Sequence, residues 1–191
     1  MKKAAMFGLD ARIALAIFGA LSVISGAALY SAIQQAKVTA LLTEMDEYGK
    51  AYYAYALDTG SDLPMAPEGT QRFDARELVS SSASGWSGPY LSLEKTATPF
   101  LGRLDHPVYG HMEYRAAKND DFLVNDFVHC DSADPCYVWV EVRDVPKNII
   151  DGLDATVDGS DGALVGNFRS WYESSSKVYD AVLKVGLKVN N

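Results

Sequence analysis

The sequence predicts an α+β protein in which a long N-terminal helix, transmembrane in its first half and amphipathic in its second, packs on a small antiparallel sheet. Three observations predict this fold. Residues 13–33 carry no charge, apolar residues then recur at helical spacing as far as Tyr55, and short alternating segments follow later in the chain. With 191 residues, of which 48% are hydrophobic and 22% charged, the chain is long enough for one folded domain and an additional element.

The uncharged run reads IALAIFGALSVISGAALYSAI from Ile13 to Ile33. A helix rises about 1.5 Å per residue, so this run can span the roughly 30 Å hydrocarbon core of a bilayer. Lys2, Lys3 and Arg12 precede the run, which predicts a cytoplasmic N-terminus and a head on the other side of the membrane. A secretory signal peptide has a shorter apolar region, of about 7–15 residues, so we favour a membrane helix.

The helix continues beyond the apolar run as an amphipathic segment. Its apolar residues gather on one side, mostly at spacings of three and four: Val38, Leu41, Leu42, Met45, Tyr48, Tyr52 and Tyr55. Gly60 provides a helix stop, and Pro64 follows shortly after. The sequence therefore predicts a leader over residues 1–8, with its boundary at 5 or 8, a helix over 9–58 and a head over 59–191.

The head is expected to combine loops, two short helices and a sheet of about four strands. Residues 59–104 are rich in Gly, Pro, Ser and Thr, which is typical of a connecting region. The spacing of apolar residues, together with the turn residues between segments, predicts helices over Phe73–Val79 and Pro146–Asp154. The same signals predict strands over His111–Arg115, Phe122–Cys130, Tyr137–Arg143, Ala163–Trp171 and Lys177–Val185. In the third of these strands, three valines share one face, whereas the other face carries Trp139, Glu141 and Arg143.

Charge and cysteine content exclude some classes of partner. The net charge of −8 and the pI near 4.8 make a nucleic-acid partner unexpected, because an acidic chain repels phosphate backbones. The two cysteines, Cys130 and Cys136, are too few for a zinc site. They either close a short disulfide loop, which would indicate an oxidising compartment such as the periplasm, or remain reduced thiols, and the membrane segment favours the disulfide.

An acidic, glycine-containing stretch runs from Asp151 to Gly162. Ca²⁺ takes six to eight oxygen ligands, and Asp158 and Asp161, together with main-chain carbonyls, are the best candidates to bind it. The spacing lacks the alternating acids and distal glutamate of an EF-hand. The pattern is more typical of a helix end followed by an acidic Asp-Gly turn, so no cofactor is expected other than this possible calcium ion.

Asp10 lies just before the apolar run, and two interpretations of it stay open. As an interfacial N-cap it would favour the positive end of the helix dipole. Alternatively, it is a buried charge that needs a positive partner, such as the amino terminus of a neighbouring processed subunit.

A short basic leader, a small residue, an acid and a long apolar helix together resemble the prepilin family. The resemblance implies cleavage of the leader by a prepilin peptidase and methylation of the new N-terminus. If Asp10 corresponds to the glutamate that is the fifth residue of mature pilins, cleavage falls between Ala5 and Met6. If Gly8 is the glycine that precedes the cut, the mature chain starts at Leu9 instead.

The head carries further likenesses to this family. Gly85-Trp86-Ser87-Gly88-Pro89-Tyr90-Leu91 resembles the W-x-GPYL segment of the major pseudopilins of type II secretion, and the stretch from Asp105 to Tyr114 is a loosened form of the segment that follows it. The cysteine loop, Val145-Pro146 and the acidic glycine loop also resemble a pattern in pilin-like proteins. Some major pseudopilins bind calcium in this region, although their ligands do not correspond residue by residue.

The resemblance implies a structural subunit of a type II secretion pseudopilus or a type IV pilus-like filament. Its partners would be the lipid bilayer, copies of itself, other pilin-like subunits, the prepilin peptidase and the inner-membrane assembly platform. It would lie in the bacterial inner membrane, with the head in the periplasm, or in a cell-surface filament. The alternative is a single-span adaptor or sensor that does not assemble. His106, His111 and His129 form no catalytic pattern with a nucleophile, so we do not expect an enzyme.

Overall fold

A computed structural model of the chain describes residues 4–67, 72–98, 101–118, 130, 135–174 and 177–190, with side chains for all of these except 4–7 and 9. The chain forms two compact units, Met1–Lys37 and Val38–Asn191. The first unit consists of the N-terminal part of helix α1 (Ala4–Thr59), and the second contains the rest of α1 and the whole sheet.

Helix α1 ends one residue later than the sequence predicts. Its last residue is Thr59, and Gly60 follows with a left-handed φ of +69°. The N–H of Gly60 donates to the carbonyl of Ala56 at 2.9 Å, so one of the last unpaired carbonyls of the helix is satisfied. The predicted glycine stop is thus confirmed.

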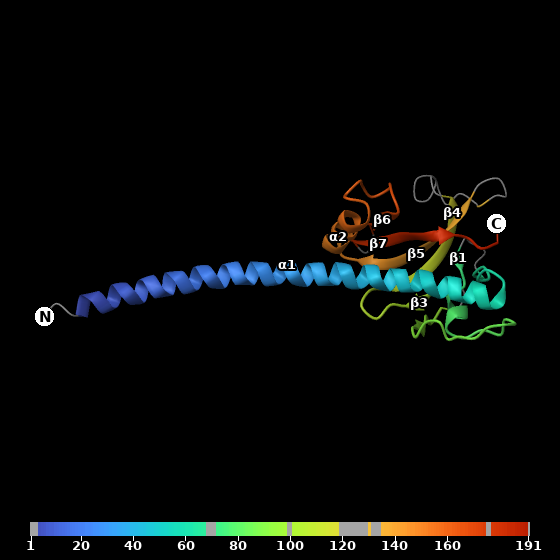
Figure 1. Cartoon of the computed structure of the whole chain (residues 1–191), viewed down its shortest axis with the longest axis horizontal. Helices are drawn as coiled ribbons and strands as arrows, with labels where there is room; N and C mark the ends of the chain where they lie inside the picture. Colours follow the sequence, from blue (N-terminus) through green and yellow to red (C-terminus); the bar gives the residue numbers. More distant parts are fainter. Residues whose placement is uncertain are drawn as a thin grey trace. The chain divides into compact units, whose positions relative to one another are not determined.

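Within the second unit, the predicted apolar stripe of α1 is buried. Val38, Leu41, Met45, Tyr48, Tyr52 and Tyr55 are each at most 5% exposed, and Leu42 is partly buried against them. Figure 1 shows β4, β5 and β7 alongside this part of α1. The helix therefore serves as one layer of the core of the head.

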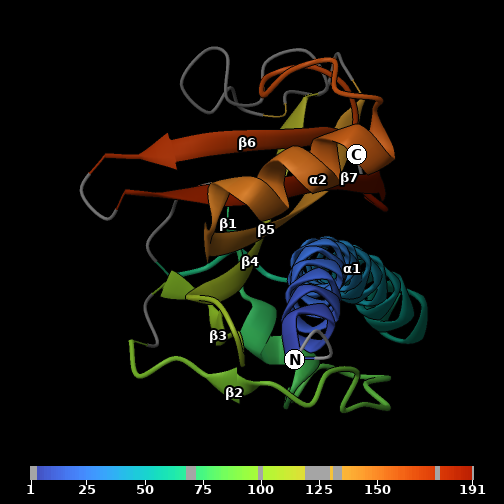
Figure 2. The same cartoon turned by 90° about the vertical axis from the view of Figure 1, so that its left-hand side faces the viewer.

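The described residues form a seven-stranded sheet in which every pairing is antiparallel. The strand order is β2-β3-β4-β5-β7-β6, and β1, which lies off this path, pairs with Tyr114 and Arg115 of β4. Three strands have only two residues each: β1 (Arg72–Phe73), β2 (Glu94–Lys95) and β3 (Leu104–Asp105). Four are longer: β4 (His111–Lys118), β5 (Cys136–Val145), β6 (Phe168–Glu173) and β7 (Val178–Leu187). Figure 2 shows β6 along the outside of β7.

Two predicted elements differ from those observed. The predicted helix at Phe73–Val79 is a short 3₁₀ turn, η1 (Ala75–Leu78), because Phe73 pairs with β4 and Asp74 caps the turn by accepting from the N–H of Arg76. The strand predicted from Ala163 begins only at Phe168, since Gly166, with φ +78°, still belongs to the preceding loop. The strand predicted at Phe122–Cys130 lies outside the described residues, apart from Cys130.

Helix α2 (Lys147–Val157) follows Pro146, as predicted, and buries Ile149, Ile150 and Leu153. It lies across β6 and β7 (Figure 2). These three residues share one hydrophobic core with the stripe of α1 and with one face of the sheet. Gly152 allows the close approach, because a Cβ atom there would stand 2.5 Å from a methyl group of Val38.

Candidate functional site

The apolar part of α1 is a candidate contact surface. α1 contains one stretch that is long and apolar enough to cross a membrane, and none of that stretch is buried within the protein. Its large apolar side chains are between 44% and 73% exposed: Ile13, Leu15, Ile17, Phe18, Leu21, Val23, Ile24, Leu29, Tyr30 and Ile33. A continuous apolar surface of this kind marks a site of contact with lipid or with other protein chains.

Asp10 lies inside α1, whose first residue is Ala4, so it is not the N-cap of the full-length chain. Its side chain is exposed, and no described residue pairs with it. Ala5, Met6 and Gly8, the residues of the two alternative cleavage positions, also lie in the first part of α1. Cleavage at either position would leave Asp10 close to a new amino terminus.

The structure brings the two candidate calcium ligands together after α2. The chain turns at Gly159, Ser160 and Gly162, which all have positive φ. Gly166 then comes close to both carboxylates: a Cβ atom there would stand 2.5 Å from Oδ2 of Asp158 and 2.8 Å from Oδ2 of Asp161. Any side chain at position 166 would therefore collide with both carboxylates, so glycine allows them to lie against the backbone there.

A third carboxylate, missed by the sequence analysis, belongs to the same loop. Burial raises the pKa of Asp154, and the charges of Asp161 and Asp158 raise it further. Its Oδ1 is buried and makes no hydrogen bond to a described residue. No three His, Cys, Asp or Glu side chains of the described chain are placed to share a metal ion, so main-chain carbonyls would have to complete a site.

Asp158 also has a structural role. Its Oδ2 accepts a hydrogen bond from the N–H of Phe168 at 2.6 Å, at the start of edge strand β6. This bond satisfies a main-chain donor on the side of β6 that pairs with none of the described strands, as the acidic-turn interpretation expects.

Both ring nitrogens of His106 take part in hydrogen bonds. Its Nδ1 accepts from the N–H groups of Val108 and Tyr109, each at 3.1 Å, so the hydrogen lies on Nε2, which faces a carboxylate oxygen of Glu44 at 2.9 Å. Burial lowers the pKa of His106, against the opposing effect of Glu44. Because both ring nitrogens are engaged, His106 fastens α1 to the loop after β3 and is not placed to act as a general base.

His111, the first residue of β4, is partly buried, and its Nε2 makes no hydrogen bond to a described residue. Burial and the nearby charge of Arg103 lower its pKa to about 4, so the ring is neutral at physiological pH. His129 lies outside the described residues.

A charged cluster, buried at its centre and partly exposed at its rim, lies on the sheet face that points away from the hydrophobic core. It consists of Arg72, Arg103, Glu113, Arg115, Glu141, Arg143 and Asp180. Glu113 is at its centre, with side-chain nitrogens of Arg103, Arg115 and Arg72 at 2.5, 2.7 and 3.0 Å. Burial opposes ionisation, but the charges of these three arginines together hold the pKa of Glu113 well below its usual range.

The tryptophan beside this cluster is also buried. Trp139 has no exposed surface, and the guanidinium of Arg169 stands 4.9 Å from its ring centre. Strand alternation placed Trp139, Glu141 and Arg143 on one face, and the burial of Trp139 and Glu141 became visible only in the folded head.

The segment resembling GPYL holds the loop after η1 against the end of α1. The hydroxyl of Tyr90 donates to a carboxylate oxygen of Asp58 at 2.7 Å, and the hydroxyl of Ser87 donates to the same oxygen. The indole N–H of Trp86 donates to the carbonyl of Glu77 at 3.0 Å. Gly85, with φ +84°, lies so close to the carbonyl of Asp58 that a Cβ atom would collide with it. The motif thus has a packing role.

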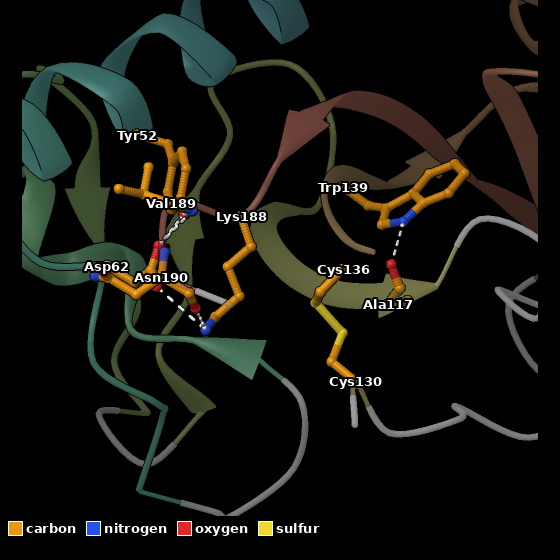
Figure 3. Close-up of a disulfide and its surroundings, with 9 residues drawn as sticks. All are labelled: Tyr52, Asp62, Ala117, Cys130, Cys136, Trp139, Lys188, Val189 and Asn190. Atoms are coloured by element: carbon orange, nitrogen blue, oxygen red, sulfur yellow. Dashed lines mark hydrogen bonds and ion pairs between the residues drawn. A yellow bond between two sulfur atoms is a disulfide. The ribbon is translucent and has the colours of Figure 1, made fainter. Parts of the chain in front are cut away.

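Cys130 and Cys136 form a disulfide, as the sequence analysis predicts (Figure 3). Cys136 is the first residue of β5, and its carbonyl accepts from the N–H of Lys188 at 2.8 Å. The same view shows the last residues bound to Asp62, which accepts from the N–H groups of Val189 and Asn190, each at 3.1 Å. The bridge therefore lies beside the point where the end of the chain is fastened to the head.

We expect the disulfide to be formed in protein isolated without reductant. Closing so short a loop stabilises the fold by about 2 kcal/mol, so replacing both cysteines by serine should lower the thermal midpoint modestly. Alkylation followed by peptide mass mapping measures the bridge directly, with a reduced and unfolded sample as the control. Two freely alkylated thiols in the unreduced protein would contradict the bridge and an oxidising location.

Comparison with known proteins finds no match: no protein-family model, no curated protein and no solved structure matches the chain. The likeness to pilin-like proteins rests on the motifs and on the architecture, a long apolar helix followed by an antiparallel sheet with a disulfide.

Proposed function

We propose that the chain is a structural subunit of a type II secretion pseudopilus or a type IV pilus-like filament, assembled through its hydrophobic N-terminal helix. One observation carries the proposal. Over residues 13–33, α1 is apolar and exposed on all sides, whereas from Val38 onward one side of the helix is buried in the head. The first part needs lipid before assembly and can pack against other copies after it, whereas the second part belongs to the head.

The proposal implies a location and a set of partners. The subunit would lie in the bacterial inner membrane with its N-terminus in the cytoplasm, because Lys2, Lys3 and Arg12 precede the apolar run. Its head would be periplasmic, where the disulfide is stable. The lipid bilayer, a prepilin peptidase, the assembly platform, copies of this chain and other pilin-like subunits would be its partners, and its role would be structural and not catalytic.

Negative-stain microscopy of the membrane-extracted protein tests the proposal. We expect thin fibres that contain this chain. A protein that stays dispersed in the native membrane and yields no fibres would favour the alternative, a single-span adaptor or sensor in the periplasm.

We expect the native protein to lack a short N-terminal leader. Cleavage between Ala5 and Met6 would place Asp10 fifth in the mature chain, and the mass of the intact, membrane-derived protein would fall accordingly. A mass that retains Met1 to Ala5 would exclude this position. Full-length protein throughout would favour the adaptor.

The acidic loop supports a second proposal, that Asp158 and Asp161 bind Ca²⁺ with main-chain carbonyls. It rests on the approach of both carboxylates to Gly166 and on the unbonded, buried oxygen of Asp154. A chelator should then lower the thermal midpoint, because a ligand at 100 times its dissociation constant stabilises the folded form by about 2.7 kcal/mol.

Asp161→Asn should abolish this response to chelator, whereas Asp46→Asn, on the exposed side of α1, should retain it. An unchanged midpoint with and without calcium would leave only the acidic turn.

A further inference from the structure

Two glutamates lie directly opposite each other in the middle of the sheet. Glu113 of β4 and Glu141 of β5 are paired in register, so their side chains leave the same face of the sheet next to each other. Glu113 has no exposed surface, and Glu141 is only 3% exposed. Neighbouring buried carboxylates repel each other when both are ionised, so this glutamate pair is a candidate to hold a proton.

The arginines around the glutamate pair are not shared equally. Glu113 is bound by three guanidinium groups, with nitrogens of Arg103, Arg115 and Arg72 at 2.5, 2.7 and 3.0 Å from its carboxylate oxygens. Glu141 accepts from Nε of Arg115, the same guanidinium that donates through its other arm to Glu113. One cation is therefore divided between the two glutamates, while two more belong to Glu113.

The second cation near Glu141 is also shared. Nε of Arg143 stands 3.6 Å from Oε1 of Glu141 but only 2.9 Å from Oδ2 of Asp180, so Asp180 is its closer partner. Among the described residues, Arg115 and Arg143 alone form ion pairs with Glu141. Glu141 thus has no guanidinium group to itself, and it is the member of the glutamate pair that is less able to carry a negative charge.

The remaining charged and titratable groups of this face lie further out along the strands. The strand register places on it Asp105 of β3, His111 of β4, Lys184 of β7, and Arg169 and Glu173 of β6. None of them forms an ion pair with either glutamate in the part of the chain that the structure describes. The balance of charge at the glutamate pair is therefore set by the arginines described above and by Asp180.

The acidities of the two glutamates are driven apart. Burial, then the charges of Glu113 and Asp180, raise the pKa of Glu141 to about 7, against the effect of Arg115. Burial opposes the ionisation of Glu113, but the three arginines and a hydrogen bond from Glu141 hold the pKa of Glu113 well below its usual range. Neighbouring carboxyl groups separated in this way hold one proton between them.

We propose that Glu113 and Glu141 form a proton-binding site, in which Glu141 carries the proton and donates it in a hydrogen bond to the carboxylate of Glu113, and that release of this proton to water above neutral pH weakens the pairing of β4 with β5. After release, two carboxylates face each other with Arg115 divided between them. The site makes the stability of the head sensitive to pH near neutrality. It concerns the head alone and does not depend on the proposed filament.

Glu141→Gln tests the site in the full-length protein, because glutamine has the shape of the protonated side chain. Its amide N–H can donate to Glu113, and its amide oxygen can accept from Arg115. At neutral pH the thermal midpoint of Glu141→Gln should stay close to that of the parent, whereas Glu113→Gln should lose stability. If both glutamates were ionised instead, Glu141→Gln would deprive Arg115 of one charged partner and should be destabilised as Glu113→Gln is.

The pH dependence supplies a second measurement. Because the pKa of Glu141 is raised to about 7, its contribution to stability is fully present below the ordinary glutamate value of about 4.3 and is lost as the pH rises through about 7. Between about pH 5 and about pH 8, the midpoint of the parent should therefore fall by about 5–10 °C relative to that of Glu141→Gln. Glu47→Gln, at an exposed position, should follow the parent.

Infrared spectroscopy detects the proton without reference to stability. At neutral pH the parent and Glu47→Gln should show the carbonyl stretch of a protonated carboxyl group that is missing from Glu141→Gln, and this band should fade as the pH is raised above about 7. A difference spectrum without the band would overturn the proton-binding site. A Glu141→Gln protein that fails to fold, or that is destabilised as much as Glu113→Gln, would overturn it as well, and either result would leave the proposed filament untouched.

Discussion

Asp10→Ala is expected to leave expression, membrane insertion and head folding intact while sharply reducing filament formation. Asp10 lies within α1 before the apolar run, and its side chain is exposed in the single chain. At the membrane interface it can reach water, but inside a packed filament it would lose that water and would need a positive partner. If the leader is cleaved as proposed, the amino terminus of a neighbouring subunit would supply that positive partner.

The size of the effect follows from the cost of breaking a buried ion pair, which is about 3–5 kcal/mol when one partner is left without the other. Repeated at each subunit contact, a loss of this size should reduce filament yield by more than about tenfold. Fibre counts by negative-stain microscopy, at equal amounts of membrane-inserted protein, give the measurement.

Asp10→Glu is the matched control. It keeps the charge and lengthens the side chain by one methylene group, so it should retain much of the assembly. Asp10→Asn keeps the shape but removes the charge, and should behave like alanine. If Asp10→Ala assembles as well as the parent, pairing with the amino terminus is wrong.

Glu113→Gln should give the largest loss of head stability among single substitutions of charged residues. Glu113 is fully buried and binds three guanidinium groups, from Arg72, Arg103 and Arg115. Without its charge, the buried guanidinium of Arg115 and the partly buried guanidinium groups of Arg72 and Arg103 keep only their remaining partners, which costs about 3–5 kcal/mol. The thermal midpoint should fall by on the order of 10 °C for a chain of this size.

The pH dependence of this effect has a definite sign. The pKa of Glu113 is lowered in the folded head, so its carboxylate stabilises the fold above the ordinary glutamate value of about 4.3, and this contribution is lost as the pH falls below it. The difference in midpoint between parent and Glu113→Gln should therefore be smaller at acidic pH than at neutral pH.

Thermal unfolding in detergent, followed by the fluorescence of buried tryptophan, measures both effects. Glu47→Gln is the matched control, because Glu47 and its partner Lys50 are exposed, and such pairs contribute at most about 1 kcal/mol. Equal midpoints for Glu113→Gln and Glu47→Gln would show that the buried cluster contributes little to stability.

Much of the candidate site required the folded chain because its partners are distant in sequence. Glu44 and His106 meet across 62 positions, and Asp58 accepts hydrogen bonds from Ser87 and Tyr90. Sequence patterns identify strands and loops, but they do not show which loop contacts which distant side chain in the folded protein. Asp154 was missed for a related reason: it lies within a predicted helix, and only the turn after Val157 brings Asp158 and Asp161 toward it.

The sequence by itself determined the elements that depend on local properties. The absence of charge over residues 13–33, the apolar stripe from Val38 to Tyr55 and the stop at Gly60 are each set by neighbours within a few turns of helix, and α1 follows them closely. Alternation likewise located β4, β5 and β7. The tertiary structure alone decided that the face carrying Glu141 is buried, because burial depends on what packs over a strand and on the register that sets Glu113 opposite Glu141.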